Sequence, residues 1–294
     1  MKYSSASAFR RALEDRLRQQ SLQSGVPLVR MRKMIAFDRF LARLFQAQPS
    51  QWVVKGGLAL QLRVGQRART TKDIDLLMLD QHQEIYPQLR EAGALSLDDW
   101  FSFEVSYATQ PTTEDFGGAR YQLQSLLNGR MFEPVQLDVG VGDPLIEPVE
   151  YLQTPSLLEF AGFSPTRVPC YPITQQIAEK LHACTRTFQS GKSSRVKDYV
   201  DILLLAGIGT IEGDRLREAI KATFVARQTH PVPNSMPEPP PGWERPFQRL
   251  AVEVQLEQQS LQEAEAALQQ FLNPVLSGNQ VGLWDPLHWR WQER

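Results

Sequence analysis

The segment Asp73-Ile74-Asp75-Leu76 places two carboxylates two positions apart in an apolar run. Successive side chains of a β-strand point to opposite faces, so this spacing predicts that Asp73 and Asp75 project side by side while the apolar residues pack into a core. Two adjacent carboxylates repel each other unless a cation lies between them. Because ligation by oxygen alone suits Mg²⁺ or Mn²⁺, the segment predicts a strand that carries a divalent metal site.

A pair of glycines precedes this strand and follows the apolar segment Trp52-Val53-Val54. Gly56 and Gly57 allow the backbone to come close to a ligand, and a helix that begins there offers N–H groups to a phosphate. Taken singly, Asp-x-Asp is often a strand end that meets solvent, and Gly-Gly is a common turn. In combination the two features favour a site for both a phosphate and a metal ion, as nucleotide chemistry requires.

The chain of 294 residues is long enough for one large domain or two smaller ones. Its 32 Lys and Arg residues nearly balance its 33 Asp and Glu residues, so overall charge does not indicate a nucleic-acid-binding protein, although a local basic surface is compatible with it. Cys170 and Cys184 lack the spacing of a metal site and are typical of a reducing compartment. With no signal-peptide core and no apolar run of membrane-spanning length, we expect a cytoplasmic protein without membrane contact.

The hydrophobic periodicity predicts an α/β half over residues 1–165 and a helical half over residues 166–294. The expected strands are 52–54, 73–79, 101–108, 120–127 and 135–141. The expected helices are 4–22, 29–46, a helix that begins after the glycine pair, 83–93, 174–184, 195–205 and much of 243–271, with an extended proline-rich connector over 229–242. The arginines of the first helix (Arg10, Arg11, Arg16 and Arg18) are expected to be solvated, with RNA contact as the less favoured interpretation.

A third carboxylate, Asp138, lies in the alternating segment 135–141, whose valines and leucine face one side. If this strand shares a sheet face with the first, Asp138 joins Asp73 and Asp75 in a two-metal site for in-line attack on a nucleotide phosphate. One ion would then activate the incoming hydroxyl, and the other would stabilise the triphosphate and the leaving pyrophosphate. Judged alone, Asp138 is better explained as a surface carboxylate on an edge strand.

Three charged residues stand out in the second half of the chain. Lys180 lies on an expected helix and could hold a triphosphate as a point charge, although an ordinary solvated lysine explains the local sequence better. Asp198 and Asp201 are three positions apart in the next expected helix and share a face. An acidic helix N-terminus favoured by the helix dipole explains this pair about equally well.

Five motifs, in this order, resemble AbiEii-type nucleotidyltransferases, which are toxins of type IV toxin–antitoxin and abortive-infection systems and are related to the MenT toxins. The motifs are Val54-Lys55-Gly56-Gly57-Leu58-Ala59-Leu60, Arg69-x-Thr71-x-Asp73-Ile74-Asp75-Leu76, Leu137-Asp138-Val139-Gly140, Glu179-Lys180-Leu181-x-Ala183 and Arg195-x-Lys197-Asp198-x-x-Asp201. The resemblance extends from about residue 25 to about residue 250. It implies an α/β fold of the nucleotidyltransferase (polymerase-β-like) class, with a mixed sheet core and a helical C-terminal half.

The resemblance also implies an activity, the Mg²⁺-dependent transfer of a nucleotide from an NTP to an acceptor, which in the MenT relatives is the 3′ end of tRNA. It implies Asp73 and Asp75 as the metal pair, with Asp138 completing the site. The remaining implied roles are the triphosphate lysine for Lys180, the helical catalytic acid for Asp198, phosphate contacts for Gly56, Gly57, Arg69 and Thr71, and supporting positions for Arg195, Lys197 and Asp201. Gly57 stands where the wider superfamily often has Ser, which leaves only backbone N–H groups for the phosphate.

The toxin interpretation implies a cognate antitoxin, encoded nearby as a separate chain. Three alternatives stay open at this point. A standalone nucleotidyltransferase could modify a protein or a small molecule by the same chemistry. A non-catalytic nucleotide-binding module would have lost carboxylates that this chain keeps, and a structural or interaction protein would leave the glycine pair and the paired carboxylates unexplained. The sequence identifies neither the NTP nor the class of acceptor.

Overall fold

The computed structural model describes residues 2–108, 118–186, 195–279 and 281–293. The chain forms two compact units. The sheet unit comprises Met1–Leu62, Thr70–Gly142 and Glu150–Cys170, and the helical unit comprises Arg63–Arg69, Asp143–Val149 and Tyr171–Arg294. The domain boundary expected after residue 165 stays a prediction.

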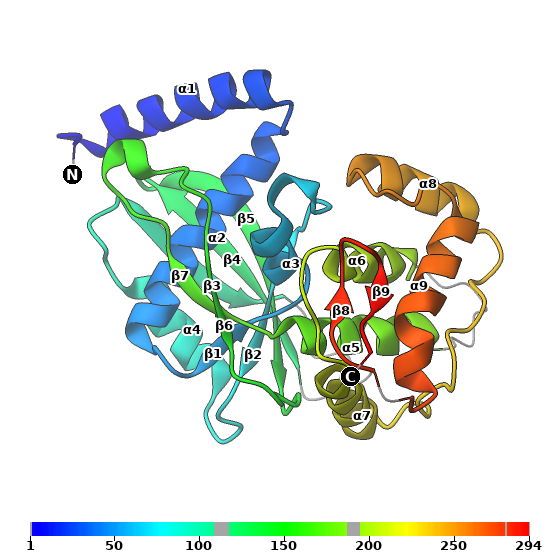
Figure 1. Cartoon of the computed structure of the whole chain (residues 1–294). Helices are drawn as coiled ribbons and strands as arrows, with labels where there is room; N and C mark the ends of the chain where they lie inside the picture. Colours follow the sequence, from blue (N-terminus) through cyan, green and yellow to red (C-terminus); the bar gives the residue numbers. More distant parts are fainter. Residues whose placement is uncertain (1, 109–117, 187–194, 280, 294) are drawn as a thin grey trace. The chain divides into compact units, whose positions relative to one another are not determined.

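Within the described residues, the sheet unit is built on a seven-stranded mixed sheet with the order β3-β4-β5-β2-β1-β7-β6 (Figure 1). β2 runs parallel to β5 and β1 runs parallel to β7, whereas the other neighbouring strands are antiparallel. The strands are β1 Trp52–Val54, β2 Asp73–Met78, β3 Phe101–Tyr107, β4 Ala119–Leu127, β5 Arg130–Val141, β6 Glu150–Gln153 and β7 Arg167–Cys170.

The helices of this unit are α1 Ala6–Ser24, α2 Leu28–Ala47, α4 Ile85–Ala94 and the start of α3 Gly56–Val64. The side chain of Ser5 caps the first turn of α1, and Gly25 ends the helix in the left-handed conformation that glycine adopts readily. α2 packs against β5, and α4 packs against β3. The core of the unit combines apolar faces of these helices with every second residue of the strands, such as Ile74 and Leu76 in β2 and Leu137 and Val139 in β5.

The helical unit contains α5 Ile173–Thr185, α6 Val196–Ala206, α7 Gly213–Arg227, α8 Glu244–Glu253, α9 Leu261–Leu276 and the short hairpin of β8 Trp284–Asp285 and β9 Arg290–Trp291. Trp284 is fully buried, and its indole N–H donates a hydrogen bond of 2.8 Å to the carbonyl of Ala206. Its ring packs on Phe271, with ring centroids 4.7 Å apart. The hairpin is thereby fixed to α6 and α9.

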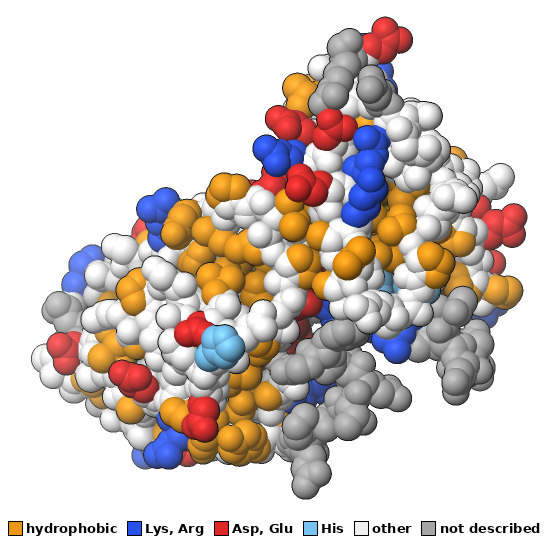
Figure 2. Space-filling view, turned by 90° about the horizontal axis from the view of Figure 1, so that it is seen from below, with side chains coloured by type: hydrophobic (Ala, Val, Ile, Leu, Met, Phe, Trp, Pro, Cys, Tyr) orange, Lys and Arg blue, Asp and Glu red, His pale blue; other side chains and the backbone are white. Residues whose placement is uncertain are grey.

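The expected α/β fold with a mixed sheet and a helical second half is confirmed. The expected strands and helices are present, but the strand expected at 135–141 begins already at Arg130, and the helical stretch expected within 243–271 forms two helices, α8 and α9, the second ending at Leu276. The elements β6, β7, α7 and the β8–β9 hairpin were not expected from the sequence. In the part of the chain that the structure describes, we find no helix with the length and apolar character of a membrane span. On the face shown in Figure 2, basic and acidic side chains are interspersed, as the near-zero net charge leads one to expect.

Candidate active site

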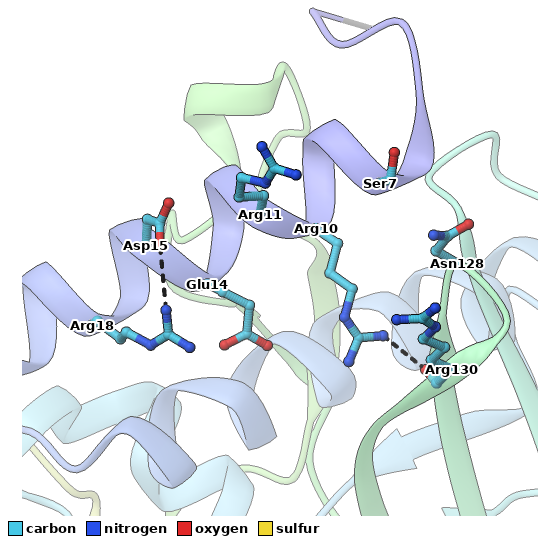
Figure 3. A pocket seen from close by; sticks show the side chains of 8 residues that line it. All are labelled: Ser7, Arg10, Arg11, Glu14, Asp15, Arg18, Asn128 and Arg130. Carbon is cyan, nitrogen blue, oxygen red and sulfur yellow. Dashed lines mark hydrogen bonds and ion pairs between the residues drawn. The ribbon is translucent and has the colours of Figure 1, made fainter.

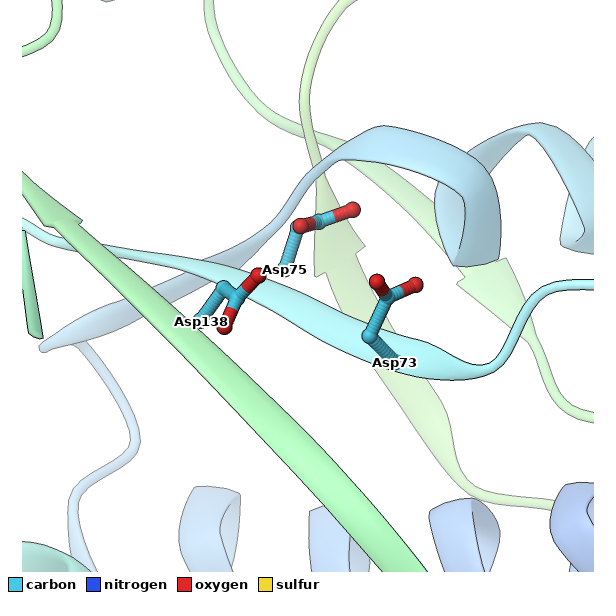
Figure 4. A group of neighbouring side chains, drawn as sticks. All are labelled: Asp73, Asp75 and Asp138. Atoms are coloured by element: carbon cyan, nitrogen blue, oxygen red, sulfur yellow. The ribbon is translucent and has the colours of Figure 1, made fainter. Parts of the chain in front are cut away.

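Three aspartates of the sheet unit converge on one face of the sheet (Figure 4). Asp73 and Asp75 project from β2, and Asp138 projects from the parallel neighbour β5, where it is the direct partner of Asp75. One carboxylate oxygen from each residue lies within 4.8 Å of the others. All three side chains are half-buried, so a ligand could reach them from solvent while their repulsion is only partly screened.

Each of the three carboxylates accepts a hydrogen bond that fixes its direction. The Thr71 hydroxyl donates to Asp73 Oδ1 over 3.0 Å. The guanidinium of Arg120 on β4 donates to both oxygens of Asp138 over 2.7 and 2.8 Å. Arg120 thus neutralises the charge of Asp138, and the three carboxylates offer the oxygen ligands that suit a divalent cation.

The glycine pair holds the third carboxylate, that of Asp75. Gly56 has a φ of +56°, and a Cβ atom added there would lie 1.7 Å from Asp75 Oδ2. The backbone N–H of Gly57, at the start of α3, donates to the same oxygen over 3.3 Å. The position therefore requires glycine because Asp75 occupies the space of a side chain, and the helix N-terminus favours the negative charge placed against it. The contact of Gly56 and Gly57 with a phosphate stays a prediction.

A second charged cluster, which we call the Lys180 cluster, lies in the helical unit and consists of Arg69, Lys180, Asp198 and Asp201. Lys180 Nζ on α5 lies 3.2 Å from Asp198 Oδ1 and 2.9 Å from Asp201 Oδ2. Arg69 binds both oxygens of Asp201, over 3.0 and 2.9 Å. Both aspartates are buried, with exposed fractions of 1% for Asp198 and 0% for Asp201, and lie one turn apart on α6.

Mutual attraction keeps Lys180 and Asp201 charged. Burial alone would lower the pKa of Lys180, but the carboxylates of Asp201 and Asp198 outweigh it and raise that pKa above its ordinary value. Burial alone would raise the pKa of Asp201, but Lys180 and Arg69 outweigh it and lower that pKa. Lys180 is therefore a protonated, positioned cation rather than the solvated lysine that the local sequence favours.

Asp198 differs from Asp201 in having one oxygen without a hydrogen bond. Among the residues that the structure describes, no donor bonds to Asp198 Oδ2, although this atom is buried. Arg195 Nη1 lies 3.8 Å from it, which is an ion pair but not a hydrogen bond. Lys197, also expected as a supporting residue, is partly buried, and burial lowers its pKa. The Oδ2 atom of Asp198 is therefore a buried acceptor without a hydrogen bond among the described residues.

The residues expected from the sequence thus form two groups. Asp73, Asp75 and Asp138 come together in the sheet unit, with Thr71, Gly56 and Gly57 beside them. Lys180, Asp198 and Asp201 come together in the helical unit, with Arg69 and Arg195. Arg69 and Thr71, expected at phosphate, bind carboxylates in the structure, and a role at phosphate stays a prediction for both.

Sequence reasoning missed Arg120, the cation bound to Asp138. Arg120 and Asp138 face each other across the antiparallel strands β4 and β5. The signal was the dipeptide Asn128-Gly129 between two alternating segments, which marks a two-residue hairpin. Both residues have the positive φ that such a turn requires, 55° and 65°.

Comparisons with known proteins give the family of the chain and a solved structure with a similar fold. A family model described as nucleotidyl transferase AbiEii toxin of a type IV toxin–antitoxin system matches residues 39–293. MenT4, a nucleotidyltransferase toxin from Mycobacterium tuberculosis H37Rv, has a similar fold with a TM-score of 0.61 at 19% identity, over 94% of this chain and 92% of that chain. JHP933 from Helicobacter pylori is less similar, with a TM-score of 0.42 at 15% identity, over 80% of this chain and 90% of that chain. The comparison with curated proteins gave no match.

Proposed function

Because the chain belongs to the AbiEii family of nucleotidyltransferase toxins of type IV toxin–antitoxin systems, we propose that it transfers a nucleotide from an NTP to an RNA, such as the 3′ end of a tRNA, and thereby arrests growth. Membership of this family implies a nucleotide substrate and an antitoxin partner. The observation that carries the proposal is the convergence of Asp73, Asp75 and Asp138, whose oxygens lie within 4.8 Å of one another.

The donor set of the three aspartates fits a divalent cation, and we propose Mg²⁺, with Mn²⁺ as a substitute. All the donors are carboxylate oxygens, the ligand type that a hard divalent cation prefers, and an oxygen of each aspartate lies within 4.8 Å of the others. When bound, the metal supplies a Lewis acid that activates the attacking hydroxyl and stabilises the leaving pyrophosphate.

The residues around the aspartates prepare this site before a metal binds. Thr71, the N–H of Gly57 and Arg120 each hold one carboxylate, so that an oxygen from each turns to a common point. Such partners of metal ligands commonly contribute a factor of about 10–100 to affinity or activity. We expect a smaller loss when one of them is removed than when Asp75 itself is removed.

In the helical unit, we propose that Lys180 contributes its charge to the triphosphate and that Asp198 accepts the proton of the attacking hydroxyl. The protonated state of Lys180 and the open Oδ2 atom of Asp198 support these roles. The double contact between Arg69 and Asp201 supports a positioning role for both, since it fixes the carboxylate that binds Lys180. A general base in the role proposed for Asp198 is worth roughly two to four orders of magnitude in rate.

The direct test is to incubate the protein with each of the four α-labelled NTPs, Mg²⁺ and total tRNA, and to size the labelled product on a denaturing gel. We expect one NTP to label tRNA, and we expect removal of Mg²⁺ by a chelator to abolish the label. Asp75→Asn should abolish it as well. Asp80→Asn is the matched control, because Asp80 lies just beyond β2, is half-buried as Asp75 is, and is not part of the aspartate cluster.

Two outcomes would contradict the proposal. Absence of labelled RNA with every NTP would reject the RNA acceptor, and label on a protein or a small molecule would favour a standalone transferase with another acceptor. Full activity of the Asp75→Asn protein would reject the aspartate cluster as the metal site, whatever the acceptor is.

A further inference from the structure

A polar pocket of about 360 Å³ lies between α1 and the turn that joins β4 to β5, within the sheet unit (Figure 3). From α1 it is lined by three arginines, Arg10, Arg11 and Arg18, with two acidic residues and a serine. From the turn it is lined by Asn128 and Arg130. The lining thus contains four arginines and two acidic residues, in a chain whose total charge is near zero.

Both carboxylates of the pocket are already neutralised. Asp15 pairs with Arg18 over 3.3 Å, and Glu14 pairs with Arg32, which does not line the pocket. In the described part of the chain, no carboxylate pairs with Arg11 or Arg130. The pocket therefore keeps a positive charge that the protein itself does not compensate, and an anion would relieve the repulsion between these arginines.

Arg10 makes the pocket a fixed structure. Its guanidinium donates to the carbonyl oxygens of Leu127, Arg130 and Met131 over 2.7, 3.1 and 3.0 Å. These bonds tie α1 to the β4–β5 turn, while Phe9, the preceding residue, is fully buried in the core. Carbonyl groups satisfy the N–H donors of Arg10 but do not cancel its charge, so Arg10 adds to the positive potential of a preformed pocket.

The position of the pocket excludes the NTP bound at the aspartate cluster as its occupant. Arg130 begins β5 and Asp138 lies eight residues further along the same strand. At a rise of about 3.3 Å per residue, the two positions are on the order of 26 Å apart. A single nucleotide cannot span this distance, whereas the phosphate backbone of an RNA can.

We propose that this pocket binds the phosphate backbone of the acceptor RNA at a distance from its reacting end. The inference rests on the proposed function, because it assumes an RNA acceptor. The planar N–H fork of arginine matches phosphate oxygens, and Ser7 and Asn128 add uncharged donors. All eight lining residues are polar or charged. Nucleic-acid interfaces are polar and positive, whereas protein interfaces usually have an apolar core, so the lining favours RNA over an acidic protein segment.

The test compares two double charge reversals. Arg11→Glu with Arg130→Glu changes two exposed residues of the pocket. Arg245→Glu with Arg249→Glu, on exposed positions of α8 in the helical unit, makes the same charge change on two residues that do not line the pocket. Each protein is assayed for transfer to total tRNA and to a short RNA oligonucleotide that covers only the last few nucleotides of the acceptor. Binding of labelled tRNA is measured over a range of salt concentrations, and thermal unfolding checks that all proteins are folded.

We expect the pocket variant to lose about tenfold in kcat/KM with tRNA and to keep wild-type kcat/KM with the oligonucleotide, which is too short to reach the pocket. The slope of log K against log salt for tRNA should fall by roughly one per lost phosphate contact. The control variant should behave as the wild type does in both assays.

Several results would overturn the inference. Equal losses with tRNA and with the oligonucleotide would mean that the arginines act at the reacting end or on the fold. If the wild type labels tRNA and the pocket variant uses tRNA equally well, the RNA-binding role of the pocket is rejected while the proposed function stands. If the wild type labels no RNA, the proposed function fails and the inference fails with it. Loss of binding to the cognate antitoxin, with tRNA use unchanged, would assign the pocket to an acidic protein partner instead.

Discussion

Neutralising Asp201 should destabilise the protein far more than neutralising an ordinary acidic residue. The Asp201 carboxylate is completely buried and binds two cations, Arg69 through two hydrogen bonds and Lys180 over 2.9 Å. Asp201→Asn keeps the shape of the side chain but removes its charge. Lys180 then keeps its contact with the Asp198 carboxylate, whereas Arg69 loses its two charged hydrogen bonds to Asp201.

The expected magnitude follows from the cost of removing one partner of a buried ion pair, here the fully buried Asp201 carboxylate, which is about 3–5 kcal/mol. With a urea m-value of about 2 kcal/mol/M, the unfolding midpoint of Asp201→Asn should fall by roughly 1.5–2.5 M.

The loss of stability in Asp201→Asn should also depend on pH. Because the pKa of Asp201 is lowered in the folded protein, its contribution is present above the ordinary value of 3.8 and is lost as the pH falls through the lower folded value.

Urea unfolding of the wild type and Asp201→Asn at neutral pH and at several values below pH 4 would check both points. Asp214→Asn is the matched control, because Asp214 pairs with Arg217 at 3.2 Å in the same unit but its side chain is 42% exposed. Loss of this exposed ion pair should lower the free energy of unfolding by no more than about 1 kcal/mol. The reasoning would be refuted if Asp201→Asn lowered the free energy of unfolding by no more than the control does. It would also be refuted if the difference in this free energy between the variant and the wild type stayed constant as the pH falls below 4.

Three further predictions concern the proposed chemistry. Gly56→Ala should abolish the stabilisation of the protein by Mg²⁺ in thermal unfolding, because its Cβ displaces the Asp75 carboxylate; an unchanged shift would mean that Asp75 is not a metal ligand. Lys180→Ala should raise the KM for the NTP in steady-state kinetics, and Lys180→Arg should recover only part of the loss; an unchanged KM would remove Lys180 from the triphosphate. Asp198→Ala should slow transfer by roughly two to four orders of magnitude and suppress growth arrest on overexpression; arrest without transfer would show that toxicity comes from binding.

The parts of the site that follow a local period could be predicted from the sequence. The two-residue period of strands put Asp73 and Asp75 on one face and Ile74 in the core, and the structure has this arrangement. The helical spacing of Asp198 and Asp201 likewise put both on one face of α6. In each case the period is a property of the backbone itself, so no knowledge of distant neighbours was needed.

The pairing of distant segments could not be predicted in the same way. Arg69 and Asp201 are 132 positions apart, and no local pattern indicates that they meet. The strands β6 and β7 have only four residues each. β7 joins the sheet through the pairing of Val54 with Cys170, and a segment this short shows no reliable alternation. Such contacts are set by tertiary packing.

The contact between Arg120 and Asp138 shows how one irregular residue decides the composition of the site. A regular hairpin around Asn128-Gly129 keeps the register of its first pairs, Leu127 with Arg130 and Leu126 with Met131. Continued along the strands, this register would put Ala119 opposite Asp138 and turn Arg120 toward the buried face of Leu137. In the structure the register shifts by one residue between the pair Leu126–Met131 and the pair Ser125–Glu133. The extra residue is in β5.

This bulge brings Arg120 onto the face of the three aspartates and directly opposite Asp138. Without the shift, the cluster would hold three carboxylates with no arginine opposite Asp138, and their mutual repulsion would be larger. With it, Asp138 is held in one orientation by two hydrogen bonds from Arg120. The alternation of β4 and β5 can be read from the sequence, but the chemistry at Asp138 depends on a single extra residue that interrupts it.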